Sequence, residues 1–299
     1  MSPEPMTPIA VGLPSETARL KTVVMCLANP MGILSFLWQG GFDLAALYQG
    51  WHNKWALTHN HRKVRQQQIA LAELLQAQGV QVHWAERVTG CLTQHYTRDV
   101  GFAIDHTFFL ARPRRRSRQR ELAGLRNLLP RFSRVARLER GHIEGGDVMV
   151  DERYILVGLG EETSLEGVEC LRSKLAQLGI KREVVTLEFA NRGVIHLDTR
   201  FNLVSRGVAL IHPRSFARNS LRWLEGQFEL IEATDQEARN VEINTLTLSA
   251  QKVVVQHTSH RLARLLEATG LEALKLDYSE VVRLPGGFRC TTLPVERSA

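Results

Sequence analysis

The sequence has few cysteines, and they are too widely spread to form a shared motif. Its 299 residues contain Cys26, Cys91, Cys170 and Cys290, with no Cys-x-x-Cys pair. This spacing argues against a zinc knuckle and against a disulfide framework. It favours reduced thiols, and we therefore expect a cytoplasmic protein.

Long apolar runs are also missing. No stretch approaches the roughly 20 apolar residues of a membrane span, so we expect no membrane partner. Residues 1–14 carry acids and prolines instead of the basic and apolar start of a signal peptide. With 44% hydrophobic and 23% charged residues, the composition is that of a soluble globular protein of one large domain or two ordinary ones.

Acidic residues are outnumbered, and the net charge is +7. Much of the excess lies in residues 112–120, which contain six arginines and no interleaved aromatic residues. Binding to single-stranded nucleic acid would favour such aromatics as stacking platforms. A solvated basic helix start explains the run better than a polyanion site, so we predict no nucleic-acid partner.

Polar residues recur at nearly even intervals. The steps from Asp99 to Asp147, Asp198, Asn244 and Cys290 are 48, 51, 46 and 46 residues. A period of this length indicates repeated supersecondary units, arranged around an axis or stacked in line. Polar residues at one phase of the repeat would converge at one end of the axis and could form a catalytic site there.

Hydrophobic patterning predicts units of helix, strand, polar turn and strand. Helical spacing of apolar residues predicts helices over residues 62–78, 117–129, 164–178, 216–225 and 259–269. The strands include one continuous strand over 102–110. No linker interrupts the pattern, so we expect a single domain, 21–299, after an N-terminal extension, 1–20. An aromatic-rich stretch after Pro30 predicts a long loop, short helices or a lid.

Four short motifs carry these polar residues. They read Thr97-Arg98-Asp99, His142-Ile143-Glu144-Gly145-Gly146-Asp147, His196-Leu197-Asp198-Thr199 and Gly286-Gly287-Phe288-Arg289-Cys290. In this order and at this spacing they resemble the guanidine-modifying (pentein) superfamily of arginine deiminases, dimethylarginine dimethylaminohydrolases and amidinotransferases. The resemblance covers roughly residues 22–294. It implies an α/β fold, a five-bladed α/β propeller of ββαβ units around a pseudo-fivefold axis, with the site at the axis.

The resemblance also implies roles for single residues. Cys290 takes the place of the nucleophile, and His196 that of the general acid and base. Glu144 takes the place of the acid that pairs with the histidine. Asp99 and Asp198 match the two carboxylates that hold the guanidinium, a planar cation suited to paired carboxylates.

Arg118 and Asp147 are further candidates for substrate binding. Arg118 lies in residues 112–121, which resemble an Arg-Pro-x-x-x-Ser-Arg-x-x-Glu stretch of the dimethylarginine-hydrolysing branch, where the arginine grips the substrate α-carboxylate. Asp147 either braces its turn or contacts the substrate. Glu162 departs from the pattern, because relatives place a carboxylate-binding arginine there. An anion at this position predicts discrimination against a free α-carboxylate and preference for a neutral or cationic substrate end.

The resemblance therefore implies a cysteine-dependent hydrolase that cleaves a guanidino C–N bond of arginine or an arginine derivative through a covalent thiouronium intermediate. It implies no metal and no organic cofactor. Three alternatives stay open, namely an amidinotransferase, a hydrolase that proceeds past citrulline to ornithine, and a non-catalytic binding protein of this fold. The expected partner is a small guanidino molecule, and a homodimer is left open.

Overall fold

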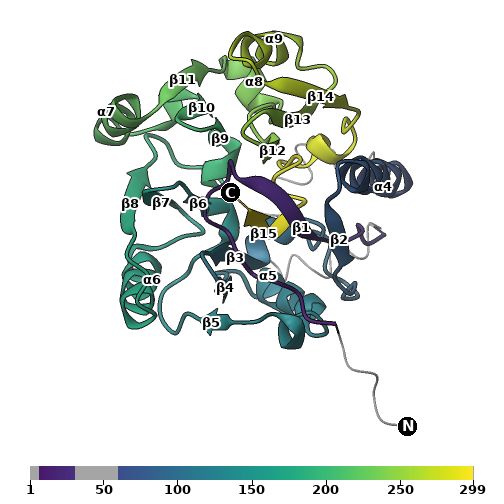
Figure 1. The fold of residues 1–299 in the computed structure, drawn as a ribbon, viewed down its shortest axis with the longest axis vertical. Helices are drawn as coiled ribbons and strands as arrows, with labels where there is room; N and C mark the ends of the chain where they lie inside the picture. Colours follow the sequence, from purple (N-terminus) through teal and green to yellow (C-terminus); the bar gives the residue numbers. More distant parts are fainter. Residues whose placement is uncertain (1–6, 31–59, 299) are drawn as a thin grey trace.

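The computed structural model describes residues 7–30 and 60–298 (Figure 1). The loop or lid predicted after Pro30 falls on residues 31–59 and lies outside the described residues. No helix within the described ranges is long and apolar enough to cross a membrane. The predicted cytoplasmic location and the homodimer stay predictions.

The strands of the described residues form five sheets of three strands each, with the middle strand of each sheet named second here. They are β3 (Gly101–Ile104), β4 (Thr107–Leu110) and β5 (Val135–Arg137); β6 (Val148–Val150), β7 (Tyr154–Leu159) and β8 (Glu183–Glu188); β9 (Phe201–Ser205), β10 (Val208–Ile211) and β11 (Glu229–Glu232); β12 (Leu246–Ser249), β13 (Lys252–Gln256) and β14 (Glu272–Leu276); and β15 (Leu293–Ser298), β1 (Arg19–Met25) and β2 (Gln81–Trp84).

All five sheets share one topology. The first two strands pair antiparallel, and the third lies parallel to the second. Parallel neighbours need a crossover connection, which usually contains a helix. The crossovers here contain α4 (His61–Ala77), α5 (Arg116–Glu121), α6 (Leu165–Gln177), α7 (Arg218–Gln227) and α9 (His260–Ala268), while the short α8 (Asp235–Arg239) links β11 to β12. One ββαβ unit is thus repeated along the chain.

The sheets lie around a common centre. Figure 1 shows β6, β9, β12 and β15 towards the middle of the view and α4, α6, α7 and α9 at the periphery. The sheet of β15, β1 and β2 joins the two ends of the chain, because β15 pairs with β1. The predicted mixed α/β class is confirmed.

Two predicted elements differ from the structure. Residues 102–110 form the hairpin β3–β4 instead of one strand, because Asp105 takes a positive φ of 47° at the turn. The helix predicted over 117–129 ends at Glu121 and is followed by short 3-10 turns at Leu122–Leu125 and Leu129–Arg131. Gly124, a residue type that is unfavourable inside a helix, lies in the first of these turns. The other four helices are present, with ends shifted by one or two residues.

The polar motifs lie in 3-10 turns that lead into the first strand of a sheet. The turns are Thr97–Val100 before β3, Gly145–Asp147 before β6 and Leu197–Thr199 before β9. The repeated topology therefore brings side chains far apart in sequence to the same end of neighbouring sheets.

The N-terminal segment, residues 7–18, packs against the body of the fold. Isolated bridges join Ile9 to Phe132, Gly12 to Glu296 and Leu13 to Asp105. The described part of the expected N-terminal extension thus contacts residues from three regions of the chain. Residues 7–18 therefore pack as an integral part of the fold. The predicted division into an extension, 1–20, and a domain, 21–299, stays a prediction.

Helix α6 is anchored next to the motif that carries Glu144. The Ser164 hydroxyl accepts the Gly167 amide (3.2 Å) and the His142 amide (2.9 Å). Ser164→Ala should therefore lower the free energy of unfolding by about 1–2 kcal/mol, measured by urea denaturation. Ser259 is the matched control, because it precedes α9 without a side-chain cap, and its buried hydroxyl has no hydrogen-bond partner within the described ranges. An equal loss in Ser259→Ala would contradict the capping role.

Candidate active site

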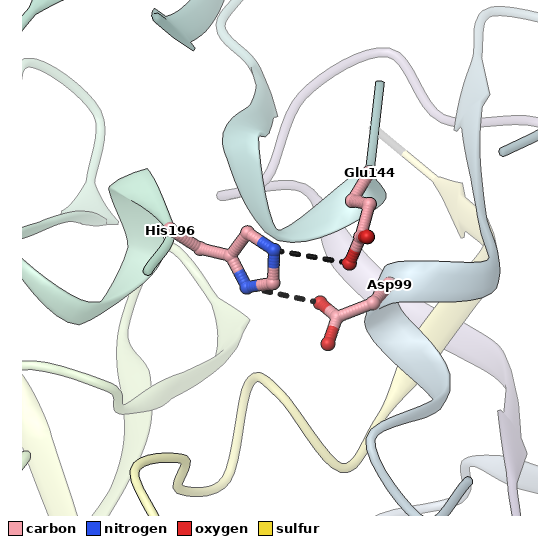
Figure 2. A group of neighbouring side chains, drawn as sticks. All are labelled: Asp99, Glu144 and His196. Atoms are coloured by element: carbon pink, nitrogen blue, oxygen red, sulfur yellow. Dashed lines mark hydrogen bonds and ion pairs between the residues drawn. The ribbon is translucent and has the colours of Figure 1, made fainter. Parts of the chain in front are cut away.

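His196 lies between two buried carboxylates (Figure 2). Its Nε2 is 3.2 Å from Oε2 of Glu144, and its Nδ1 is 3.5 Å from Oδ1 of Asp99. The three residues come from three different 3-10 turn regions. The structure therefore brings together three of the residues that the motifs singled out.

These carboxylates determine the protonation of the histidine. Burial alone would lower the pKa of His196, but Asp99, Glu144 and Asp147 raise it well above its usual value. The ring is therefore an imidazolium at neutral pH. A buried imidazolium can give a proton to a departing nitrogen.

The close approach of His196 to Asp99 requires a glycine in the neighbouring turn. A Cβ atom at Gly146 would lie 2.7 Å from both Oδ1 of Asp99 and Cγ of His196. The second glycine of the Glu-Gly-Gly-Asp motif is thus explained by space and not by backbone conformation.

A guanidinium group already occupies the acidic cluster. Nη2 of Arg118, on α5, pairs with Oδ2 of Asp99 and lies 3.7 Å from Oε2 of Glu144. Nη1 of the same side chain lies 3.1 Å from Oε2 of Glu121. The expected contact of Arg118 with a substrate carboxylate stays a prediction, since here its guanidinium faces the acids.

The cluster has the spacing of a cation site. Asp99, Glu144 and His196 each place one polar atom within 4.8 Å of the others, which would suit a metal ion or an organic cation. In this structure the Arg118 guanidinium and the His196 imidazolium both lie against the two acids.

Cys290 lies against the second predicted guanidinium-binding acid. Its Sγ is 3.5 Å and 3.6 Å from the two carboxylate oxygens of Asp198. Burial and the charges of Asp198 and Asp99 raise the pKa of the Cys290 thiol well above its usual value. The thiol is therefore protonated in this state, and an added positive charge would favour the reactive thiolate.

Asn244 is a site residue that the motif comparison did not identify. Its Nδ2 donates to Sγ of Cys290 (3.1 Å), and its Oδ1 accepts the amides of Cys290 (3.0 Å) and Gly287 (3.1 Å). Asn244 thus orients both the sulfur and the turn that carries it. In the sequence, Asn244 could be recognised by its place in the repeat, because it lies 46 residues from both Asp198 and Cys290.

Asp147 makes two hydrogen bonds within the protein. Its Oδ1 accepts the Leu197 amide (2.9 Å), and its Oδ2 accepts the Thr163 hydroxyl (2.6 Å). Burial raises its pKa to about 7, although the charge of His196 and both hydrogen bonds oppose the shift. These contacts are those of a brace for the turn after His196, and a substrate contact stays a prediction.

Glu162, the departure from the family pattern, is buried in an ion pair. Its Oε1 lies 2.6 Å from Nη2 of Arg115 and 3.6 Å from Nη2 of Arg114. Its Oε2 is buried without a hydrogen-bond partner in the part of the chain that the structure describes. The arginine-rich residues 112–120 thus provide ion-pair partners for Glu162 in addition to a solvated face.

Comparison with known proteins relates the chain to one family. A family model described as arginine deiminase matches residues 92–227 and 222–297. The uncharacterized protein YkgA of Bacillus subtilis (strain 168) is 27% identical over 232 residues, covering 77% of this chain and 79% of YkgA. The arginine deiminase of Streptococcus uberis (strain ATCC BAA-854 / 0140J) is 32% identical over 197 residues, covering 54% of this chain. The alignment spans 48% of that enzyme, about half its length.

A solved structure shares the fold. It is the product-bound N-terminal domain of ArgZ, an arginine dihydrolase from the ornithine–ammonia cycle in Cyanobacteria. Its TM-score is 0.76 at 19% identity, over 92% of this chain and 97% of that domain. At this identity the likeness concerns the fold alone.

Gly146→Ala should uncouple His196 from Asp99, because the added methyl group requires space that the ring and the carboxylate fill. We expect the His196 pKa to move towards the ordinary value of about 6.5, measured by NMR titration of the ring protons. Gly226→Ala is the matched control, since nothing lies within 4 Å of a Cβ at that position. An unshifted His196 pKa in folded Gly146→Ala would show that the pair does not depend on this glycine.

Proposed function

This chain belongs to the arginine deiminase family of the pentein superfamily, and on that premise we propose that it is a cysteine-dependent hydrolase of a guanidino C–N bond. The proposed substrate is arginine or an arginine derivative. One observation carries the proposal: the guanidinium of Arg118 pairs with Asp99 beside Glu144 and His196. A pocket that accepts a guanidinium of the protein has the charge and the planar acceptors to accept that of a substrate.

The resemblance to the pentein superfamily also implies how the five sheets are arranged. We interpret the five sheets as blades of a closed α/β propeller, with β15–β1 pairing as its closure. The turns before the first strands would then surround the axis. This arrangement accounts for the acids and Cys290 meeting at one end.

The first proposed step is activation of the thiol. A substrate guanidinium placed between Asp99 and Asp198 would offset the two charges that raise the pKa of Cys290. The thiol proton is then lost to solvent, and the thiolate forms only when substrate is bound. Arg118 would leave the acids and meet the anionic end of the substrate.

The proposed chemistry follows from the positions of Cys290 and His196. The thiolate bonds to the guanidinium carbon, and the C–N bond breaks as the imidazolium protonates the departing nitrogen. This leaves a cationic S-alkylthiouronium and a neutral His196. The imidazole takes a proton from water as the hydroxide adds to the carbon. The C–S bond then breaks to release the thiolate, and the added hydroxyl group loses its proton to the departed amine or to solvent, which leaves a neutral ureido product.

A panel of guanidino compounds tests this function directly. Incubation of the protein with arginine, methylated arginines and decarboxylated or amidated arginine should convert at least one of them into a ureido compound, detected by mass. Amidino transfer to an added amine would favour the transferase alternative. Loss of a second nitrogen to give ornithine would favour the dihydrolase alternative, and no turnover of any compound would overturn the proposal.

Substitutions should separate chemistry from binding. Cys290→Ser and His196→Ala should each lower kcat by about 10²-fold or more, because these groups take part in bond making and proton transfer. Asp99→Ala should chiefly raise KM, because a carboxylate holds the cation in both the ground state and the transition state. Cys170→Ser, at another buried thiol, is the control and should retain turnover. Full turnover in Cys290→Ser would exclude covalent catalysis at this residue.

Glu162 gives a test of substrate choice. If its unpaired oxygen faces the substrate, its charge should disfavour a free α-carboxylate, and Arg115 offsets only part of that charge. Glu162→Gln keeps an acceptor for Arg115 while removing the charge. We expect the ratio of kcat/KM for arginine to kcat/KM for arginine amide to rise roughly threefold to tenfold, about 1 kcal/mol.

Glu161→Gln is the matched control for this prediction. It makes the same substitution at the adjacent, exposed residue, and the ratio should not change. An unchanged ratio in Glu162→Gln as well would place Glu162 outside the reach of the substrate.

A further inference from the structure

A carboxylate from the N-terminal segment is buried behind the candidate active site. Glu16 lies three residues before β1 and is 4% exposed. Its amide donates to the carbonyl of Val150 at the end of β6 (2.7 Å). The segment therefore places an acidic side chain inside the body of the fold, where a charge needs partners.

Three buried arginines surround this carboxylate. Oε1 of Glu16 lies 2.8 Å from Nη2 of Arg289 and 3.3 Å from Nη1 of Arg98. Oε2 lies 3.9 Å from Nη2 of Arg297. Burial alone would raise the pKa of Glu16, but the three arginine charges lower it to about 2. Glu16 is thus an anion at neutral pH.

Arg289 connects Glu16 to the candidate site. Its Nη2 donates to Glu16 and to the Val148 carbonyl (2.8 Å each), while its Nη1 donates to Oδ2 of Asp198 (2.9 Å). The guanidinium fork is rigid and planar, so a partner on one side fixes the direction of the other side. Asp198 in turn lies against the Cys290 sulfur.

Arg98 makes a second connection to the same turn. Its amide donates to the Cys290 carbonyl (3.0 Å), and its Nε donates to the Arg289 carbonyl (3.4 Å). Arg98 directly precedes Asp99, and Arg289 directly precedes Cys290. One carboxylate therefore joins the two chain segments that carry Asp99 and Cys290.

We propose that Glu16 is a positioning residue of the active site, which holds Arg289 and Arg98 so that Asp198 and Cys290 keep their places and their charge environment. The proposal rests on the function proposed above. It assigns to the N-terminal segment a part in catalysis without contact to substrate.

The charges around Cys290 predict in which direction its thiol pKa shifts when the charge of Glu16 is removed. The described charged and titratable groups that act on Cys290 include Asp198, Asp99, Arg289, Tyr96 and Tyr278. Removing the charge of Glu16 leaves Arg289 paired with Asp198 alone among the described carboxylates, so the positive potential at the sulfur increases. The thiolate becomes easier to form, and the thiol pKa should fall.

Alkylation by iodoacetamide measures this effect without any substrate. In Glu16→Gln, the pH midpoint of Cys290 alkylation should move to lower pH by roughly one unit. Mass spectrometry of digested protein resolves the four cysteines, so the buried Cys26, Cys91 and Cys170 serve as internal controls. Glu237→Gln is the matched control, because Glu237 is also buried and paired with an arginine, Arg261, but lies on α8. It should leave the midpoint of Cys290 unchanged.

A second pair of variants, compared with each other, tests the same effect if Glu16→Gln does not fold. Arg297→Met and the double variant Glu16→Gln/Arg297→Met differ only in the charge of residue 16. The double variant also keeps the net charge of the cluster, so its midpoint should lie near that of wild type and below that of Arg297→Met. An unchanged Cys290 midpoint within a folded pair, or an equal increase in alkylation at all four cysteines, would overturn the proposal.

Kinetics on the substrate found with the guanidino panel provide the second readout. Glu16→Gln should lower kcat by about tenfold to a hundredfold with a smaller change in KM, because the reacting groups lose their exact placement, and Glu16→Asp should restore part of the loss. Wild-type kcat in Glu16→Gln would overturn the proposal. If wild-type protein converts no guanidino compound, the proposed function fails, whereas the alkylation result still decides the role of Glu16.

Discussion

Charges buried where the five sheets meet must be paired, because an isolated buried ion costs several kcal/mol. The centre meets this constraint with two connected groups. In one group, Asp99 and Glu144 surround Arg118 and His196. In the other, Glu16 lies among Arg98, Arg289 and Arg297. The ion pair of Arg289 with Asp198 joins the second group to the cysteine.

The same pairing determines which protons the resting site holds. The carboxylates raise the pKa values of both His196 and Cys290, so the histidine is charged and the thiol is neutral. For the proposed reaction, such a site would have an acid ready for the leaving group but would lack a nucleophile until another cation arrives. In the proposed reaction the substrate supplies that cation, which couples binding to activation of the thiol.

Glu162 illustrates how a departure from a family pattern is accommodated. An acid replaces an expected arginine, yet Arg115 and Arg114 lie beside it and keep the local charge positive. The expected repulsion of a carboxylate is therefore weaker than the substitution alone suggests. The arginine-rich residues 112–120, which the sequence suggested were a solvated helix start, supply these two arginines and also Arg118.

The sequence by itself determined the repeating unit and most helices, because these depend on local patterning at a fixed period. Motifs that resemble one family also marked His196, Glu144, Asp99, Asp198 and Cys290 as candidates, and their catalytic roles stay predictions. The sequence did not separate β3 from β4, because the turn at Asp105 depends on one positive φ in a polar dipeptide. It gave no sign that Glu16 belongs to the centre, and it marked Asn244 by its place in the period without revealing its contact with the Cys290 sulfur. Only the tertiary structure decided those contacts, because they join side chains from distant segments whose meeting depends on how the sheets pack.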